Sequence, residues 1–127
     1  MKKRFKKFVS SILIGCMVVA MFSISAFAGQ AKLVTTYKGY AVNGYVRAYG
    51  TSATALLEYE KSDKLKILLN TYWSDDGTHY YYTSDSANTT GKSVDVYWKR
   101  AAGQTAKSST AYFYINNNNF ATKTATV

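Results

Sequence analysis

The side chains best suited to chemistry in this chain lie around its single histidine. His79 follows the turn-forming sequence Asp75-Asp76-Gly77 by two residues. A histidine and a carboxylate could activate one of the many serines as a nucleophile, and two carboxylates could hold a cation. Nothing in the sequence singles out one serine, and adjacent aspartates before a glycine are typical of turns. We therefore interpret His79 as an exposed surface residue and predict no metal site.

Other catalytic combinations have equally simple explanations. Glu58 and Glu60 would share one face of a strand, as a glycosidase pair might, yet an exposed polar face accounts for them. The only cysteine is Cys16, close to the N-terminus, which leaves no thiol nucleophile or thiolate metal site in the rest of the chain. No glycine-rich phosphate loop is present. The sequence therefore predicts a protein that is not an enzyme and has no cofactor.

Tyrosine is the residue type that suggests a function. All 12 tyrosines follow residue 36. Tyrosine combines a flat apolar ring with a hydroxyl at low rotamer cost, which suits stacking on sugars or anchoring an interface. Cross-strand aromatic pairs also stabilise a sheet by about 0.2–1 kcal/mol each, so a purely structural role is the competing interpretation. The predicted binding residues are the outward-facing tyrosines and nearby basic side chains: Tyr45, Arg47, Tyr49, Tyr72, His79, Tyr81, Tyr97, Lys99, Tyr112 and Tyr114.

The elements that position these residues read as β-strands. Aromatic and β-branched residues alternate with polar ones in short runs separated by Gly, Asn, Asp and Ser, and no helical period competes. Asn43-Gly44 favours a type I′ hairpin, although it could also lie within one longer strand. Seven or eight short strands predict a single-domain antiparallel β-sandwich first and a small barrel second. The predicted strands are 33–42, 45–49, 51–60, 64–73, 78–83, 93–99, 110–115 and 120–126.

Alternation predicts which side chains face the core. In 64–73 the apolar residues Leu65, Ile67 and Leu69 are odd-numbered, so Tyr72 should point outward. The same pattern buries Ala53, Ala55, Leu57, Tyr59, Val46, Ala48, Val94, Val96, Trp98, Phe113 and Ile115. A two- or four-residue loop after Trp73 would place Tyr80 and Tyr82 inside and His79 and Tyr81 outside, whereas a three-residue loop would reverse them.

The N-terminal 28 residues predict export. Five basic residues precede an apolar run, and Ala26-Phe27-Ala28 provides small residues at a cleavage site, so we expect a cleaved signal peptide at 1–28 and a secreted domain at 29–127. The apolar run is long enough to remain as a membrane anchor, but its serines and its cleavage site argue against that. A lipobox-like sequence ending at Cys16 is a weaker alternative, because the residues after it are still apolar.

The net charge and the expected export of the protein limit the kinds of partner that it could bind. Five of the 16 lysines and arginines precede residue 29, so 11 remain against seven acids, a net charge of +4. These charges are scattered and the protein is expected outside the cell, which argues against nucleic acid. In composition alone, the chain resembles small secreted proteins of Gram-positive bacteria, including bacteriocin-like ones. We expect a non-enzymatic protein that binds cell envelope or polysaccharide; the alternative is a secreted toxin acting on a competitor's envelope or membrane.

Overall fold

The computed structural model describes residues 29–127, and the predicted signal peptide with Cys16 lies outside them. The described part is all β: 79% of it is strand, and it contains no helix. Six strands form one antiparallel sheet that curls until it is nearly barrel-shaped. The strands are β2 (Gln30–Tyr37), β3 (Tyr40–Tyr49), β4 (Ser52–Ser74), β5 (Tyr81–Tyr97), β6 (Thr105–Ile115) and β7 (Asn118–Thr126).

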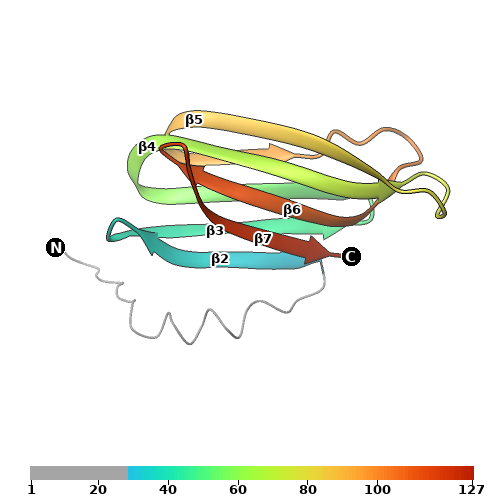
Figure 1. Ribbon diagram of the computed structural model, residues 1–127, viewed down its shortest axis with the longest axis horizontal. Helices are drawn as coiled ribbons and strands as arrows, with labels where there is room; N and C mark the ends of the chain where they lie inside the picture. Colours follow the sequence, from blue (N-terminus) through green and yellow to red (C-terminus); the bar gives the residue numbers. More distant parts are fainter. Residues whose placement is uncertain (1–28) are drawn as a thin grey trace.

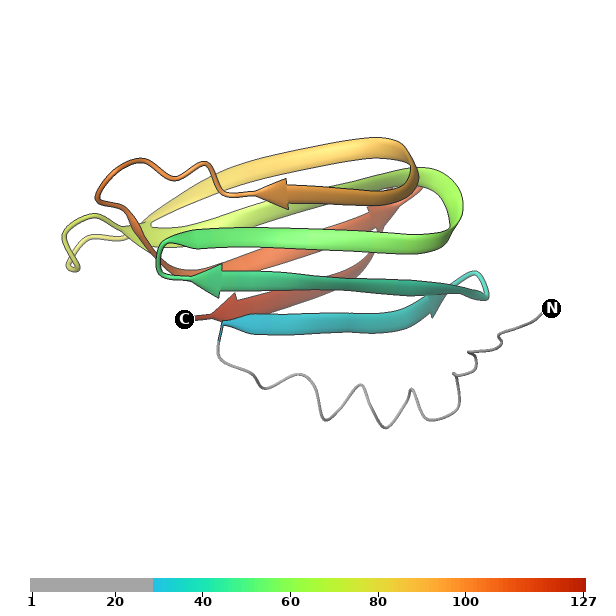
Figure 2. The same ribbon diagram turned by 180° about the vertical axis from the view of Figure 1, so that it is seen from behind.

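Two long strands, β4 and β5, connect the two walls of this flattened barrel. The N-terminal half of β4 pairs with β3 and with the C-terminal half of β5, and β3 pairs with β2. The C-terminal half of β4 pairs with the N-terminal half of β5 and with β6, and β6 pairs with β7. We call the wall with β6 and β7 the front layer (Figure 1) and the wall with β2 and β3 the back layer (Figure 2).

The predicted count of seven or eight strands is therefore wrong. Segments 51–60 and 64–73 are both parts of β4, which continues through residues 61–63 with a register shift between Glu58 and Asp63. The segment 84–92, predicted as a loop, is the middle of β5. β5 pairs only with β4, so one of its edges is open, and polar side chains are compatible with strand structure there. β6 likewise begins five residues earlier than predicted.

The turn between the first two strands is not at Asn43-Gly44, the hairpin site that the sequence favoured; the alternative, in which this dipeptide lies within a longer strand, is correct. Asn43-Gly44 lies within β3, and the hairpin instead uses Lys38 and Gly39, whose φ angles of 51° and 84° suit a type I′ turn. Gly44 is needed for another reason: a Cβ at this position would lie 2.5 Å from the Leu56 carbonyl oxygen of the neighbouring strand. The glycine thus permits a close backbone approach rather than a turn.

The core fills the space between the two layers, and it matches the alternation expected from the sequence. The apolar side chains that alternation predicted to be buried are buried, with Leu57, Ile67 and Phe113 fully inaccessible, whereas Tyr80 and Tyr82, also predicted to lie inside, are exposed. Thr71 and Ser109 are buried as well, and their hydroxyl oxygens lie 2.9 Å apart in a hydrogen bond between β4 and β6. The core therefore contains one satisfied polar pair among apolar side chains.

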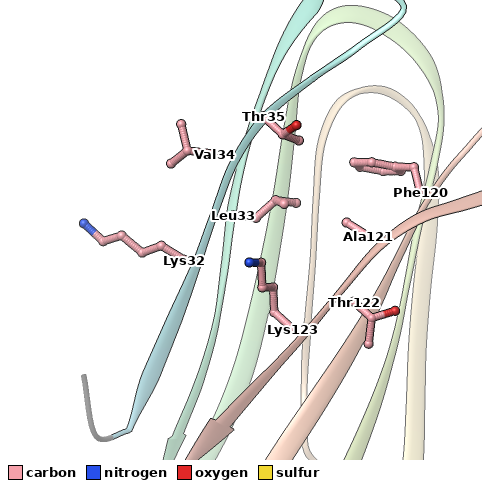
Figure 3. A pocket seen from close by; sticks show the side chains of 8 residues that line it. All are labelled: Lys32, Leu33, Val34, Thr35, Phe120, Ala121, Thr122 and Lys123. Atoms are coloured by element: carbon pink, nitrogen blue, oxygen red, sulfur yellow. The ribbon is translucent and has the colours of Figure 1, made fainter. Parts of the chain in front are cut away.

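The sheet stops short of closure between its edge strands β2 and β7. At one end, the Gly29 N–H donates to the Thr126 carbonyl (2.6 Å); at the other, the Asn118 side-chain amide donates to the Tyr37 hydroxyl (2.9 Å). Between these ties a pocket of about 270 Å³ remains, lined by residues 32–35 of β2 and 120–123 of β7 (Figure 3). In this seam Lys123 points toward Leu33, so the aliphatic part of the Lys123 side chain and the Leu33 side chain partly fill the gap (Figure 3).

Candidate functional site

Two tyrosine rings pack against a third at the end of the front layer, where the chain passes from β4 into β5. The ring of Tyr72 stacks on that of Tyr80, with centroids 5.1 Å apart and planes 20° apart, and lies 4.9 Å from that of Tyr82. Tyr80 is 40% exposed and Tyr82 is 73% exposed. We call Tyr72, Tyr80 and Tyr82 the tyrosine platform. Large exposed rings gathered in one place are typical of binding surfaces.

The loop that carries Tyr80 is held by side-chain capping. The buried Ser74 hydroxyl accepts hydrogen bonds from the N–H groups of Asp76 and Gly77 (3.3 and 2.8 Å). One carboxylate oxygen of Asp76 accepts the N–H groups of Thr78 and His79 (2.7 and 2.8 Å). The Tyr80 hydroxyl donates to the Gly77 carbonyl at 3.1 Å. These bonds fix the loop before any ligand arrives, which lowers the entropic cost of binding.

The histidine belongs to this loop, and the nearby Ser74 does not form a catalytic triad with it. His79 Nδ1 lies 2.7 Å from Asp76 Oδ2, and the hydrogen bond from the His79 side chain is the main reason that the pKa of Asp76 lies well below its usual range; the backbone N–H groups of His79 and Thr78 lower it further. The Ser74 hydroxyl donates to the Asp76 carboxylate at 3.2 Å, not to the imidazole. A catalytic triad requires the serine on the histidine, so this array caps a turn.

The prediction for the facing of Tyr80 and Tyr82 is wrong. β4 and β5 pair Tyr72 with Tyr82 and Trp73 with Tyr81, so Tyr82 shares the outer face with Tyr72, while Tyr81 lies beside Trp73 with ring centroids 4.9 Å apart. The reason is the length of the loop, because an odd number of residues between Trp73 and Tyr81 reverses the parity expected for a two- or four-residue turn. The capping residues Ser74 and Asp76 were the signal for a longer loop.

The predicted binding residues divide between the layers. Tyr72, Tyr112 and Tyr114 point outward from the front layer, where Lys66 lies 5.2 Å from the centre of the Tyr114 ring. Tyr45, Arg47, Tyr49 and Tyr97 point outward from the back layer, and Lys99 is exposed just after β5 ends. His79 and Tyr81 lie at the end of the molecule, at and just after the β4–β5 loop. The tyrosines therefore do not form one contiguous face.

The tyrosines of the back layer do not gather into one stacking surface. The guanidinium carbon of Arg47 lies 3.9 Å from the centre of the Tyr45 ring, so one face of that ring is already covered. Arg47 also donates from Nε to the Gln30 side chain at 3.3 Å. Tyr49 and Tyr97 are 46% and 60% exposed, but they make no ring contact with each other or with Tyr45 within residues 29–127.

Some tyrosines serve the fold. Tyr37 packs against Phe120 with ring centroids 5.3 Å apart and against Tyr59 at 6.0 Å, which covers the end of the core beside the seam. The Tyr59 hydroxyl donates to the Tyr37 carbonyl at 3.0 Å, and burial is the main cause that raises the pKa of Tyr59. The structural interpretation thus holds for these two rings, whereas Tyr80 and Tyr82 of the tyrosine platform are exposed.

The carboxylates do not gather into a site in the described part of the chain. Glu60 accepts the Ala41 N–H at 2.8 Å, so it is occupied in holding β3, and Glu58 is exposed nearby. Across residues 29–127, no cluster of three or more His, Cys, Asp or Glu side chains is suitable for a metal ion. The same residues include no helix that is long and apolar enough to cross a membrane.

Comparisons of the chain with protein-family models, with curated proteins and with solved structures gave no significant match.

Proposed function

We propose that this protein is a small secreted binding protein that recognises a polysaccharide, such as one in a cell envelope, through the tyrosine platform. The observation that carries the proposal is the contact of Tyr72, Tyr80 and Tyr82 on a loop held by its own side-chain hydrogen bonds. A sugar ring has apolar C–H faces and hydroxyl rims, and a tyrosine offers a matching ring and hydroxyl.

Exposure supports binding over a purely structural role for these rings. Tyr82 leaves 73% of its surface accessible, so it contributes little apolar burial to the fold. A ring that serves only as a cross-strand partner for Tyr72 gains at most about 1 kcal/mol from the pair. A ligand that covers the two exposed rings beside the half-buried Tyr72 ring explains why they are kept together at the surface.

The proposal is tested by retention of the purified protein on insoluble polysaccharides and cell walls, with anionic liposomes alongside. The variant Y80A/Y82A removes the two exposed rings of the tyrosine platform. A control variant, Y49A/Y97A, removes two comparably exposed tyrosines from the back layer. Urea midpoints of both variants, followed by tryptophan fluorescence, establish that the fold survives.

We expect Y80A/Y82A to bind about tenfold or more weakly, since anchoring aromatic residues each contribute on the order of 1–2 kcal/mol to an interface. Y49A/Y97A should bind within twofold of the unmodified protein, about 0.4 kcal/mol. If Y80A/Y82A bound as tightly as the unmodified protein, or if only Y49A/Y97A lost binding, the assignment of the binding site to the tyrosine platform would be refuted. Retention on liposomes alone would favour the membrane-active toxin instead.

A further inference from the structure

The outer surface of the front layer continues from the tyrosine platform along β4 and β5. Side chains that point outward follow one another every second residue, so Tyr72 leads to Asn70, Leu68 and Lys66 on β4. The facing residues of β5 are Tyr82, Ser84, Ser86 and Asn88. From Tyr72 to Lys66 the distance along the strand is about 20 Å at about 3.3 Å per residue. We call this strip the β4–β5 lane.

Between its two ends the β4–β5 lane carries polar side chains and one apolar residue, Leu68. Ser84 donates a hydrogen bond to the Asn70 side chain at 2.6 Å, which orients both groups on the surface. Ser84 and Ser86 are small, so no tall side chain of β5 interrupts the way. On the other flank Tyr112 stands opposite Leu68 in the pairing of β4 with β6. An extended polymer could therefore lie along the strands with rings or hydroxyls beside it.

The far end of the β4–β5 lane is a polar hollow with two lysines. Its volume is about 380 Å³, and its lining residues are Lys64, Leu65, Lys66, Asn88, Thr89, Thr90 and Asn117. Amide and hydroxyl groups offer hydrogen bonds, and both charged side chains are cations. Such a hollow matches a group that is negatively charged and rich in oxygen.

The charge of the β4–β5 lane is not neutralised by acids of the described chain. Asp85 is the only acid in residues 81–91 of β5, the part that precedes the register shift with β4. It pairs with the inward-facing Leu69, so its side chain lies on the inner side of the sheet. Asp63 lies at the register shift of β4, and its carboxylate accepts a hydrogen bond from the backbone N–H of Lys64. Within residues 29–127, neither Lys64 nor Lys66 forms a salt bridge. Neither ammonium group is therefore paired with an acid of the described chain, although the Lys66 ammonium lies 5.2 Å from the centre of the Tyr114 ring.

We infer that the ligand is a linear polysaccharide with repeated negative charges, which lies along the β4–β5 lane with a sugar on the tyrosine platform and an anionic group at Lys64 and Lys66. This inference rests on the proposed function and adds the charge and the direction of the polymer. The anionic group is a carboxylate or a phosphate, since both present the oxygens that lysine ammonium groups bind.

The test compares polymers that differ only in charge. Polygalacturonate carries a carboxylate on each sugar, whereas its fully methyl-esterified form has the same backbone without charge. Phosphorylated dextran beside plain dextran tests phosphate as the source of the charge. Affinities are measured by biolayer interferometry for the unmodified protein, for K64Q/K66Q, and for the control K32Q/K38Q, which removes the same charge from β2 and the β2–β3 turn.

We expect at least one charged polymer to bind about fivefold or more tightly than its neutral partner at low salt, from two exposed lysine–anion contacts. K64Q/K66Q should abolish that preference, and K32Q/K38Q should keep it. Added salt should weaken the binding of the charged polymer only, because salt screens the attraction between exposed charges. Comparison of the carboxylated polymer with the phosphorylated polymer shows which anion the protein prefers.

The two hypotheses fail in different ways. Equal affinity for charged and neutral polymers, or equal losses in K64Q/K66Q and K32Q/K38Q, would overturn the inference while leaving the proposed function intact if Y80A/Y82A still reduces binding. Binding that is unchanged in Y80A/Y82A would overturn the proposed function. Failure of both charged polymers to bind would overturn the inference, whereas the proposed function would fall if the protein were not retained on insoluble polysaccharides or cell walls.

Discussion

The buried hydroxyl pair between β4 and β6 makes a prediction whose sign depends on whether one or both partners are removed. Thr71 and Ser109 are each 0% exposed, and their oxygens lie 2.9 Å apart. They pair directly across the two strands, next to Tyr72 on β4. A hydroxyl left without a partner in this position loses its hydrogen bond but cannot regain one from water.

The magnitudes follow from that asymmetry. T71V keeps the shape of the side chain and leaves the Ser109 hydroxyl unpaired, which should lower the free energy of unfolding by about 1–3 kcal/mol. S109A leaves the Thr71 hydroxyl unpaired and should cost a similar amount. The double variant T71V/S109A removes both polar groups, so its stability should lie within about 1 kcal/mol of the unmodified protein. A loss of 1 kcal/mol corresponds to about 4–8 °C in Tm for a domain of this size.

The assay is urea unfolding followed by tryptophan fluorescence. Trp73 and Trp98 lie with ring centroids 6.4 Å apart at the end of the core near the tyrosine platform, so their emission reports on this region. The coupling energy comes from a double-mutant cycle, which separates the pair from each side chain alone. Additive losses, with the double variant less stable than either single one, would refute the reasoning that the two hydroxyls satisfy each other.

Two further predictions concern the backbone and the loop. G44A should lower the free energy of unfolding by about 1–3 kcal/mol in urea denaturation, because the added methyl group meets the Leu56 carbonyl oxygen. G91A has open space at its Cβ, so it should leave the free energy of unfolding unchanged or raise it by up to about 1 kcal/mol. Equal effects of the two variants would contradict the close approach of Gly44 to β4. Because the pKa of Asp76 is lowered in the folded loop, its stabilisation should be complete above about pH 4 and be lost as the pH falls further, while in the folded protein the NMR amide shifts of Thr78 and His79 should stay constant through about pH 4. D76N should show the loosened loop already at pH 7, and amide shifts in the unmodified protein that titrate near pH 4, the ordinary range of an aspartate, would contradict the capping role.

Alternation along the strands was enough to predict an all-β antiparallel fold and the apolar side chains of the core, although the sequence favoured a β-sandwich over the nearly barrel-shaped sheet that forms. Leu65, Ile67 and Leu69 face inward because side chains of a strand point to opposite sides in turn, whatever the neighbouring strands are. The same argument correctly placed Tyr72, Tyr97 and Lys99 outside. Local geometry therefore determines facing within one strand without knowledge of the topology.

Strand boundaries depended on pairing and could not be read from the chain. The polar residues 84–92 are typical of a loop, yet β4 supplies hydrogen-bonding partners along one side and solvent satisfies the other. Lys38-Gly39 and Asn43-Gly44 both contain a glycine that can turn the chain, and the choice between them came from the register of β2, β3 and β4. A hairpin at Asn43-Gly44 would forfeit the close contact of Gly44 with β4.

The sequence by itself determined that the protein is rich in outward-facing tyrosines on an all-β scaffold, because composition and a period of two are local properties. Only the tertiary structure decided which rings meet. The loop after Ser74 has a length that brings Tyr80 and Tyr82 onto Tyr72, and the bend of β4 and β5 sends Tyr97 to the opposite layer. Such neighbours are set by loop parity and by the closure of the sheet, and both depend on contacts between residues far apart in the chain.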